Sequence, residues 1–291
     1  MAEKRALVLG GGGPVGIAWE SGLAAGLAEE GLVIAEADYI VGTSAGSFVG
    51  AQLASGRSAA SLAKAQLAMG AADAAKSGGG KAFARTPDLA PVLAMMAHMP
   101  AEGEPSEAPL KEIGAYAAAA QTLDEDAYVA SFGWIADPAT PYPARYHCTI
   151  IDVETGAFRV VGPGDGAPLG RAIAASCSVP GIFPPVTIWG RRWMDGGMRS
   201  PTNADVAAGH KRTLVIAVTV GTADFKAGRL GWELSELEGA GGRAEIITPD
   251  ANSLAAFGPN LMHAADRAAI TQAGLAQGRR EAARLKAFWT L

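Results

Sequence analysis

Short apolar runs alternate with glycine-rich and helical stretches over the first part of the chain. Residues 6–9 and 39–41 are apolar runs of strand length, and a cluster of glycines follows each of them. Between the two runs, Ile17, Leu23 and Leu27 recur at helical spacing, and an Ala-rich stretch of helical character follows the second run. This order of strand, helix, strand and helix predicts an α/β fold that begins with a parallel sheet.

Residues 56–134 have a different composition. They are rich in alanine and contain breaks at residues 77–80 and 100–105. The pattern predicts an insertion of helices joined by loops, which we interpret as a possible cap over a functional site. A plain helical insertion with no gating role is the alternative.

Strand patterns return in the second half of the chain. Residues 146–151 and 158–161 are separated by a short glycine-containing turn, and residues 186–189 and 192–194 flank Gly190. Each pair predicts a β-hairpin.

The C-terminal third predicts helical and strand segments in turn. We expect a helix over residues 202–208, a strongly apolar strand over 213–220, and a helical end over 261–288. The end is one long helix or two, interrupted near Gly274 or Gly278.

Composition and charge narrow the class of protein. The chain has 291 residues, of which 49% are hydrophobic, so residues 1–291 can form one large domain with an insertion. The net charge of −5 argues against a nucleic-acid partner, and any membrane contact is expected to be apolar and peripheral. The apolar run at residues 6–9 is too short for a signal peptide or a membrane span, and Cys148 and Cys177 show no disulfide or metal pattern. We therefore expect a cytoplasmic protein without metal or cofactor.

The sequence Gly-Thr-Ser-Ala-Gly at residues 42–46 places a serine between two glycines, directly after a strand and before a helix. This is the arrangement of a nucleophile elbow, in which a strained turn exposes the Ser44 hydroxyl at a helix N-terminus. The same letters also occur in ordinary strand-to-helix turns. Cys177 is a second possible nucleophile, but its proline-rich, apolar surroundings favour a packed thiol.

The glycines after the first strand offer amide donors for an oxyanion. Gly11, Gly12 and Gly13 have no side chain, so their backbone can approach a ligand closely, and the helix that follows points its N-terminus towards it. Because this loop and the serine loop end neighbouring parallel strands, we expect both to face one crevice.

The glycine loop also fits a nucleotide-binding pattern. Residues 11–16 match Gly-x-Gly-x-x-Gly, and Glu36 or Asp38 lies near the place of a ribose-binding acid. That acid should stand at the end of the second strand, whereas Asp38 precedes it and Ser44 follows it. We therefore favour the hydrolase interpretation.

A serine nucleophile needs a base, and Asp195 is the favoured candidate. It ends an apolar segment and precedes two glycines, so its carboxylate can sit in a tight, partly desolvated turn. A surface Asp-Gly turn is the simpler interpretation of this motif alone. His210 follows Asp195 in the order of an α/β-hydrolase triad, but it lies in a polar run. The four histidines of the chain are His98, His147, His210 and His263.

Three motifs in this order, residues 11–16, residues 42–46 and Asp195-Gly196-Gly197, together resemble the patatin-like phospholipase family. The likeness extends to about Asp205 and includes residues 174–185. It implies a three-layer α/β/α fold with a mainly parallel sheet and a Ser-Asp dyad without histidine. In this chain Ser44 would be the acyl acceptor, Asp195 its base and the amides around Gly11, Gly12 and Gly13 the oxyanion hole. The glycines that would support these motifs are Gly16, Gly42, Gly46, Gly196 and Gly197.

The resemblance implies a serine acyl hydrolase acting on lipid esters, of phospholipase A, lysophospholipase or carboxylesterase type. The glycine loop of the family commonly carries Arg or Lys where this chain has Val15. A catalytically silent acyl-lipid-binding protein of the same fold is the alternative. The oligomeric state is left open.

Overall fold

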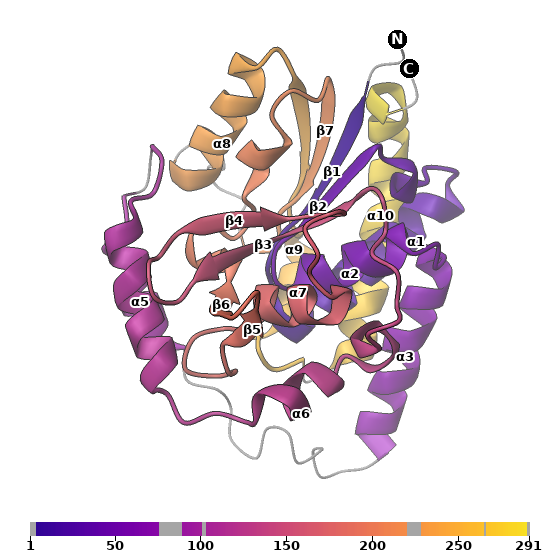
Figure 1. Cartoon of the computed structure of the whole chain (residues 1–291). Helices are drawn as coiled ribbons and strands as arrows, with labels where there is room; N and C mark the ends of the chain where they lie inside the picture. The colour runs from indigo at the N-terminus through magenta and orange to yellow at the C-terminus, as the bar shows by residue number, and fades with distance from the viewer. Residues whose placement is uncertain (1–3, 76–88, 101–102, 220–227, 265, 290–291) are drawn as a thin grey trace.

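The chain is described here by a computed structural model that covers residues 4–75, 89–100, 103–219, 228–264 and 266–289. The break expected at residues 77–80 lies outside these ranges. Within them, eight strands form one mixed sheet with helices on both faces (Figure 1). The predicted three-layer α/β/α fold is therefore confirmed.

The sheet combines a parallel part with an antiparallel part. Its order is β5-β6-β3-β2-β1-β7-β8, and β4 pairs with β3 beside this path. The pairs β3–β2, β2–β1, β1–β7 and β7–β8 are parallel, whereas β3–β4, β3–β6 and β5–β6 are antiparallel. Both predicted hairpins are thus present, as β3–β4 and β5–β6. The strands are β1 (Arg5–Leu9), β2 (Tyr39–Gly42), β3 (Tyr146–Asp152), β4 (Phe158–Val161), β5 (Val186–Ile188), β6 (Arg191–Asp195), β7 (Arg212–Ile216) and β8 (Arg243–Ile247).

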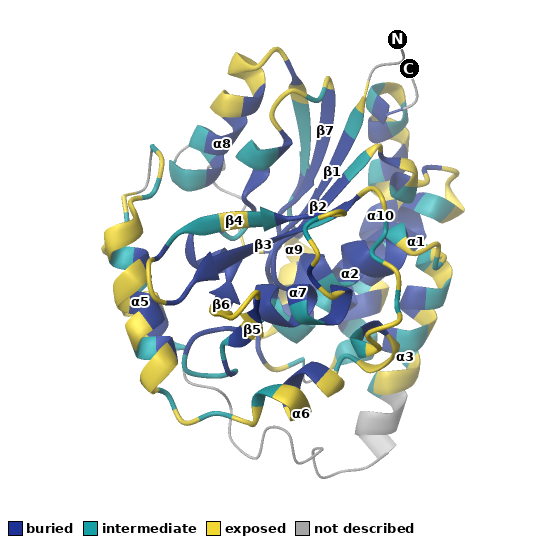
Figure 2. Ribbon diagram, in the orientation of Figure 1, coloured by how far each residue is buried: buried dark blue, intermediate teal, exposed yellow. Residues whose placement is uncertain are grey.

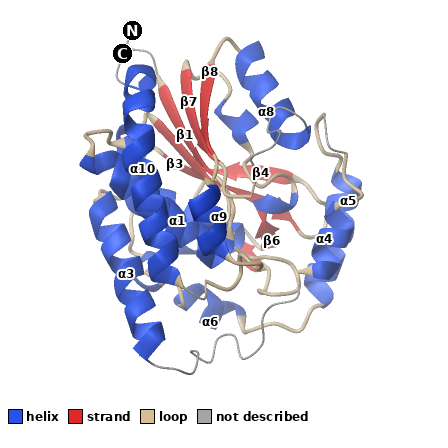
Figure 3. Cartoon of the chain, turned by 180° about the vertical axis from the view of Figure 1, so that it is seen from behind, coloured by secondary structure: helices blue, strands red, loops and turns tan. Residues whose placement is uncertain are grey.

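Helices surround the sheet and connect its strands, as the view from behind shows (Figure 3). The α-helices are α1 (Gly13–Glu29), α2 (Ala45–Ala54), α3 (Ala59–Ala75), α4 (Ala90–Met96), α5 (Glu107–Ala119), α6 (Glu125–Ala130), α7 (Leu169–Ser176), α8 (Gly228–Gly239), α9 (Ala251–Phe257) and α10 (Arg267–Trp289). Short 3₁₀ helices are η1 (Ile34–Glu36), η3 (Gly133–Ala136), η4 (Gly196–Met198) and η5 (Ala204–Ala207).

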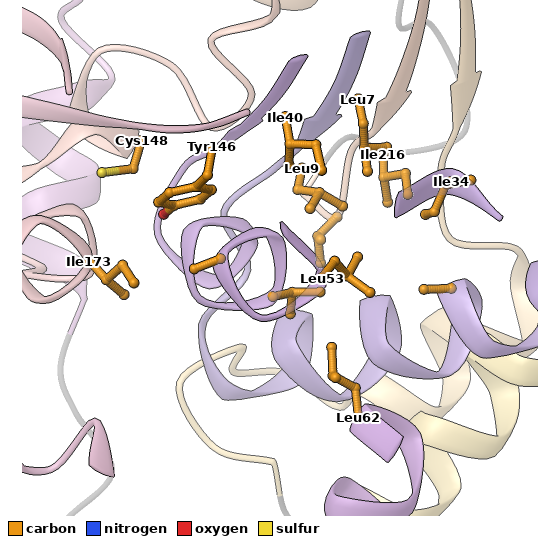
Figure 4. Close-up of a cluster of buried hydrophobic side chains, with 14 of the residues drawn as sticks. Leu7, Leu9, Ile34, Ile40, Leu53, Leu62, Tyr146, Cys148, Ile173 and Ile216 are labelled. Carbon is orange, nitrogen blue, oxygen red and sulfur yellow. The ribbon is translucent and has the colours of Figure 1, made fainter. Parts of the chain in front are cut away.

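The central strand β1 is buried on both faces (Figure 2). Leu7 and Leu9 face a core that includes residues of α1, α2, α7 and α10, part of which is seen in Figure 4. Ala6 and Val8 face a second core, formed with α8 and η5. A strand covered on both sides needs a continuous apolar run, which explains why residues 6–9 contain no polar side chain.

The helices of residues 56–134 are distributed over the molecule. Helix α3 packs against α1 and α10. Helix α5 packs on β3, where Leu110 and Ile113 join a core with Met194. Helix α6 packs on α7. Most of the described insertion therefore belongs to the outer layers, and a cap function remains a prediction that concerns α6 first.

The C-terminal helix α10 runs without a break through both of its central glycines. A β-carbon at Gly274 would overlap the Trp19 carbonyl oxygen of α1, and one at Gly278 would overlap that of Leu23. In return, Gly22 and Gly26 of α1 leave room for the backbone of α10. The glycines that seemed to mark an interruption are instead required for close packing of two helices.

Two other segments differ from expectation. Instead of a helix over residues 202–208, the chain forms only the short 3₁₀ helix η5. The reason is Asn203, which has a left-handed backbone with φ of 50° and therefore cannot continue an α-helix. The apolar strand predicted over residues 213–220 is β7, which ends at Ile216; Val220 lies outside the described residues.

Candidate active site

Ser44 lies in a strained turn between β2 and α2. Its φ of 53° and ψ of −118° are unusual for a residue with a side chain. Both flanking glycines are needed for packing, because a β-carbon at Gly42 would overlap the Gly46 carbonyl oxygen and one at Gly46 would overlap that of Leu9. The local sequence therefore folds as the expected elbow, with Ser44 as the N-cap of α2.

The pairing of β3 explains how Ser44 comes close to Asp195. Strand β2 pairs with Cys148 through Gly42, and β6 pairs with Ile150 through Asp195. Strand β4 pairs with the same two residues of β3 from the other side. Strands β2 and β6 therefore share one edge of β3, run in opposite directions and end facing each other. Two residues 151 positions apart in sequence are brought together at this point.

Asp195 is a buried acid without a cationic partner among the described residues. Asp195 is only 1% exposed, and its Oδ1 atom accepts a hydrogen bond of 2.7 Å from the Gly197 amide. Burial raises the pKa of Asp195 to about 7, while the Gly197 amide and the Ser44 side chain act in the opposite direction through hydrogen bonds. A carboxylate with a pKa near neutrality, next to a serine hydroxyl, is suited to accept its proton.

His147 and His210 lie away from the Ser44–Asp195 pair. The rings of His147 and His210 contact the Tyr39 ring in tilted arrangements, at centroid distances of 4.3 and 4.8 Å. Tyr39 begins β2, so this cluster lies at the opposite end of the strand from Ser44. Within the described ranges, no histidine hydrogen-bonds to either member of the Ser44–Asp195 pair.

The glycine loop after β1 approaches the same place. A β-carbon on Gly11 would lie 3.3 Å from Cβ of Ser44, so the loop and the elbow are in close contact. The Gly11 amide, however, donates to the Pro201 carbonyl at 2.7 Å. For the amides of Gly12 and Gly13, no acceptor is found in the described part of the chain. The three glycines predicted as donors thus divide into one that is engaged and two that are available.

The first helix turn after the loop is closely packed. Gly13 has a φ of 56°, and a β-carbon there would contact Leu261 and Met262. Gly16 allows α1 to approach the start of α2, because a β-carbon would lie 3.1 Å from that of Ala45. Val15 is fully buried, and its amide donates to Leu261 at 3.2 Å. This position is therefore occupied by a buried apolar side chain without a charge.

The structure shows two partners of Ser44 that the sequence patterns did not identify as such. The Ser44 amide donates to Ser176 Oγ at 3.1 Å, and the Cys177 thiol donates to the Ser44 carbonyl at 3.1 Å. Burial raises the pKa of Cys177, which favours a packed thiol over a nucleophile. Their place at the C-terminal end of α7 could be seen in the sequence, but only the fold brings them to Ser44.

Glu20 is a second buried acid close to the glycine loop. It is fully buried in α1, and its carboxyl oxygens have no hydrogen-bond partner among the described residues. Burial raises its pKa well above the usual value, and the nearby Gly10 amide, which donates to the Ile216 carbonyl at 2.9 Å, offsets only part of this effect. In the sequence, Glu20 stands out only as a single acidic residue within an apolar helical stretch.

Aromatic side chains gather beside the pair. Phe48 lies one turn after Ser44 in α2, and its ring contacts Phe132 edge-on at 5.8 Å. Tyr128 of α6 contacts Phe132 and stacks on Phe183 at 4.7 Å. We call these four residues the aromatic wall.

Metal ions and membrane spans were considered separately. Over the described ranges, no group of three His, Cys, Asp or Glu residues is arranged to hold a metal ion. None of the described helices is both long and apolar enough to cross a bilayer.

Comparison with known proteins gives one family match. A family model described as patatin-like phospholipase matches residues 7–208. The crystal structure of VipD from Legionella pneumophila is similar with a TM-score of 0.43 and 14% identity, over 77% of this chain and 51% of that one. The type III effector ExoU is similar with a TM-score of 0.38 and 15% identity, over 96% and 54%. The chain thus spans about half the length of either protein. No curated protein matches it.

Proposed function

The chain belongs to the patatin-like phospholipase family, and from this premise we propose that it is a serine hydrolase of lipid carboxylic esters with a Ser44–Asp195 dyad. The single observation that carries the proposal is the meeting of a strained serine with a buried carboxyl whose pKa is about 7. No histidine is needed, because Asp195 itself has the affinity for a proton that a general base requires.

The proposed reaction has two steps. Asp195 takes the proton of the Ser44 hydroxyl as its oxygen attacks the ester carbonyl, and the protonated acid then supplies a proton to the leaving alcohol. In the second step Asp195 activates water, which hydrolyses the acyl-enzyme and frees the Ser44 hydroxyl. The same carboxyl therefore acts as base and acid in turn.

The developing negative charge needs donors, and we assign this role to the amides of Gly12 and Gly13. They are the two amides of the loop without an acceptor in the described structure, and they open α1. The N-terminus of α2 directly after Ser44 adds favourable electrostatics. Gly11 contributes its close approach to Ser44, since its own amide is bound to Pro201.

The aromatic wall supports an apolar acyl group as the substrate part nearest the dyad. Tyr128 is close enough to Asp195 for the two groups to interact electrostatically, and Phe48 follows Ser44 by one helical turn. Burial of an acyl chain against these rings would be stabilised by the hydrophobic effect. With the buried Val15 in place of a cation, we propose that head-group charge contributes little to binding.

The test is a series of p-nitrophenyl esters of increasing chain length, assayed beside phospholipids and lysophospholipids. We expect hydrolysis that improves with chain length and is lost in Ser44→Ala. A fluorophosphonate probe should label the protein and fail to label Ser44→Ala. Binding of acyl lipids without labelling or turnover would instead identify a catalytically silent lipid-binding protein.

A further inference from the structure

Asn203 connects the segments that carry the proposed dyad. It is fully buried, and its φ of 50° turns the chain sharply just before η5. Its Nδ2 atom lies 2.7 Å from Ser200 O, 3.1 Å from Thr43 Oγ1, 3.1 Å from Gly196 O and 3.4 Å from Thr149 Oγ1. These acceptors include the residue before Ser44, the residue after Asp195 and the strand β3 between them.

The positively charged Arg199 side chain fixes the orientation of the Asn203 amide group. Its Oδ1 atom accepts a hydrogen bond of 2.9 Å from the Arg199 guanidinium, which in turn makes two hydrogen bonds with the Asp205 carboxylate at 2.9 and 2.7 Å. A guanidinium only donates, so the amide oxygen of Asn203 must face Arg199. Its N–H groups must therefore face the acceptors next to the dyad, among them Thr43 Oγ1 and the Gly196 carbonyl.

The peptide unit between Gly196 and Gly197 links Asn203 to Asp195 through hydrogen bonds. The Gly196 carbonyl and the Gly197 N–H belong to the same planar trans peptide and point in opposite directions. The carbonyl accepts from Asn203 Nδ2 and from the Arg199 amide, each at 3.1 Å, and the N–H donates to Asp195 Oδ1 at 2.7 Å. With glycine on both sides, the orientation of this peptide depends on these hydrogen bonds. We propose that Asn203 is a positioning residue that holds the Gly196–Gly197 peptide so that its N–H stays directed at the Asp195 carboxylate.

The Gly197 N–H has a marked influence on the pKa of Asp195, because the neighbouring titratable groups are uncharged. The titratable groups that interact with the carboxyl are Tyr128 and Cys177, and burial raises the pKa of both, so neither is charged near pH 7. The Gly197 amide and the Ser44 side chain are the hydrogen-bonding groups that oppose the effect of burial on the pKa of Asp195. Loss of the amide should therefore raise this pKa further.

The test replaces Asn203 in two ways. Asn203→Gly removes the side chain and keeps the left-handed backbone, whereas Asn203→Asp keeps the size and the contact with Arg199 but cannot donate to Gly196. The carboxyl carbon of Asp195, assigned with Asp195→Asn, is titrated by NMR, and ester hydrolysis is measured from pH 5 to 10. In both variants we expect the midpoint of each curve to rise by roughly one pH unit, and kcat at pH 7 to fall about fivefold with KM unchanged.

The matched control is Thr202→Val. It removes the buried hydrogen bond from Thr202 Oγ1 to Glu233 in the same segment, at 2.5 Å, and leaves the Gly196–Gly197 peptide untouched. We expect lower stability but an unchanged midpoint. Unshifted midpoints in the folded Asn203 variants would overturn the proposal, and so would an equal shift in Thr202→Val.

The activity curve rests on the proposed hydrolase function, whereas the NMR titration does not. A protein without esterase activity whose Asp195 titration still shifts on replacement of Asn203 would contradict the function and support the positioning role. An active protein whose Asp195 titration does not shift on replacement of Asn203 would support the function and contradict the positioning role.

Discussion

Two buried aspartates end two paired strands of the same sheet, Asp152 on β3 and Asp195 on β6, and their surroundings have opposite effects. Asp152 binds Arg191 at 2.5 Å, the amides of Glu154 and Thr155 at 2.9 Å and the Thr155 hydroxyl at 3.0 Å. Burial alone would raise the pKa of Asp152, but these donors together lower it below the usual value.

Asp195 is as inaccessible to solvent as Asp152, but it lies deeper in the protein and has fewer donors. One amide and one serine hydroxyl leave the effect of burial dominant, so its pKa is raised to about 7. The difference shows that the depth of burial together with the number and charge of the donors decides whether an acid stabilises a turn or stays available for proton transfer. Four changes would break or sharpen this comparison.

The largest effect concerns the replacement of the base. Asp195→Asn should lower kcat for ester hydrolysis by at least about a thousandfold, because the amide cannot accept the Ser44 proton. Asp152→Asn should leave kcat within about threefold, since Asp152 lies at the far end of the β3–β6 pair. Steady-state kinetics on a p-nitrophenyl ester measures both. Comparable losses in the two variants would contradict the separation of roles.

The pH dependence of activity gives the next effect. The base must be ionised, so kcat/KM should be level above about pH 7 and fall about tenfold per unit below it, reaching a loss of about 100-fold at pH 5. Asp152 should leave no mark on this curve, because its pKa is lowered and it stays ionised throughout. A flat profile between pH 5 and 8 would mean that Asp195 is not the base.

The stability of the two variants should change in opposite directions. The unfolded chain ionises an aspartate near pH 3.8, whereas the folded protein keeps Asp195 neutral until about pH 7. Stability is therefore lost as pH rises through this window, and Asp195→Asn should raise the free energy of unfolding by about 4 kcal/mol at pH 7 and by nearly nothing at pH 3.5. Urea denaturation at the two pH values measures this difference.

The contribution of Asp152 to stability changes with pH in the opposite direction. Its folded-state pKa is lowered, so its contribution is present above pH 3.8 and lost as pH falls through the folded-state value. Asp152→Asn should therefore destabilise the protein at pH 7 by about 1 to 3 kcal/mol, the usual result of removing a buried charge that holds several donors. A neutral or stabilising result would show that the hairpin does not depend on this carboxylate.

The sequence was informative where the signal is local. A strand followed by Gly-x-Ser-x-Gly predicted the turn at Ser44, and alternating apolar runs predicted both hairpins, because neighbouring residues alone determine these features. The fold class followed from the same patterns and from the resemblance of three motifs taken together.

Features that depend on distant pairing could not be derived in this way. Nothing near Gly11 in sequence indicates that its amide binds Pro201, and nothing near Asn203 indicates that it contacts Thr43. The glycines of α10 were ambiguous for the same reason, since only the approach of α1 shows whether they interrupt the helix or permit close packing.

The smallest effect is expected for His210, the residue through which a triad was considered. Its ring contacts the Tyr39 ring at a tilt and its Nδ1 atom lies 2.9 Å from the Ala207 carbonyl, at the end of β2 remote from Ser44. His210→Ala should therefore leave kcat within about twofold and lower the free energy of unfolding by no more than about 1 kcal/mol, through the lost ring contact. A large fall in kcat with normal stability would restore histidine as the base, and the high pKa of Asp195 would then need another explanation.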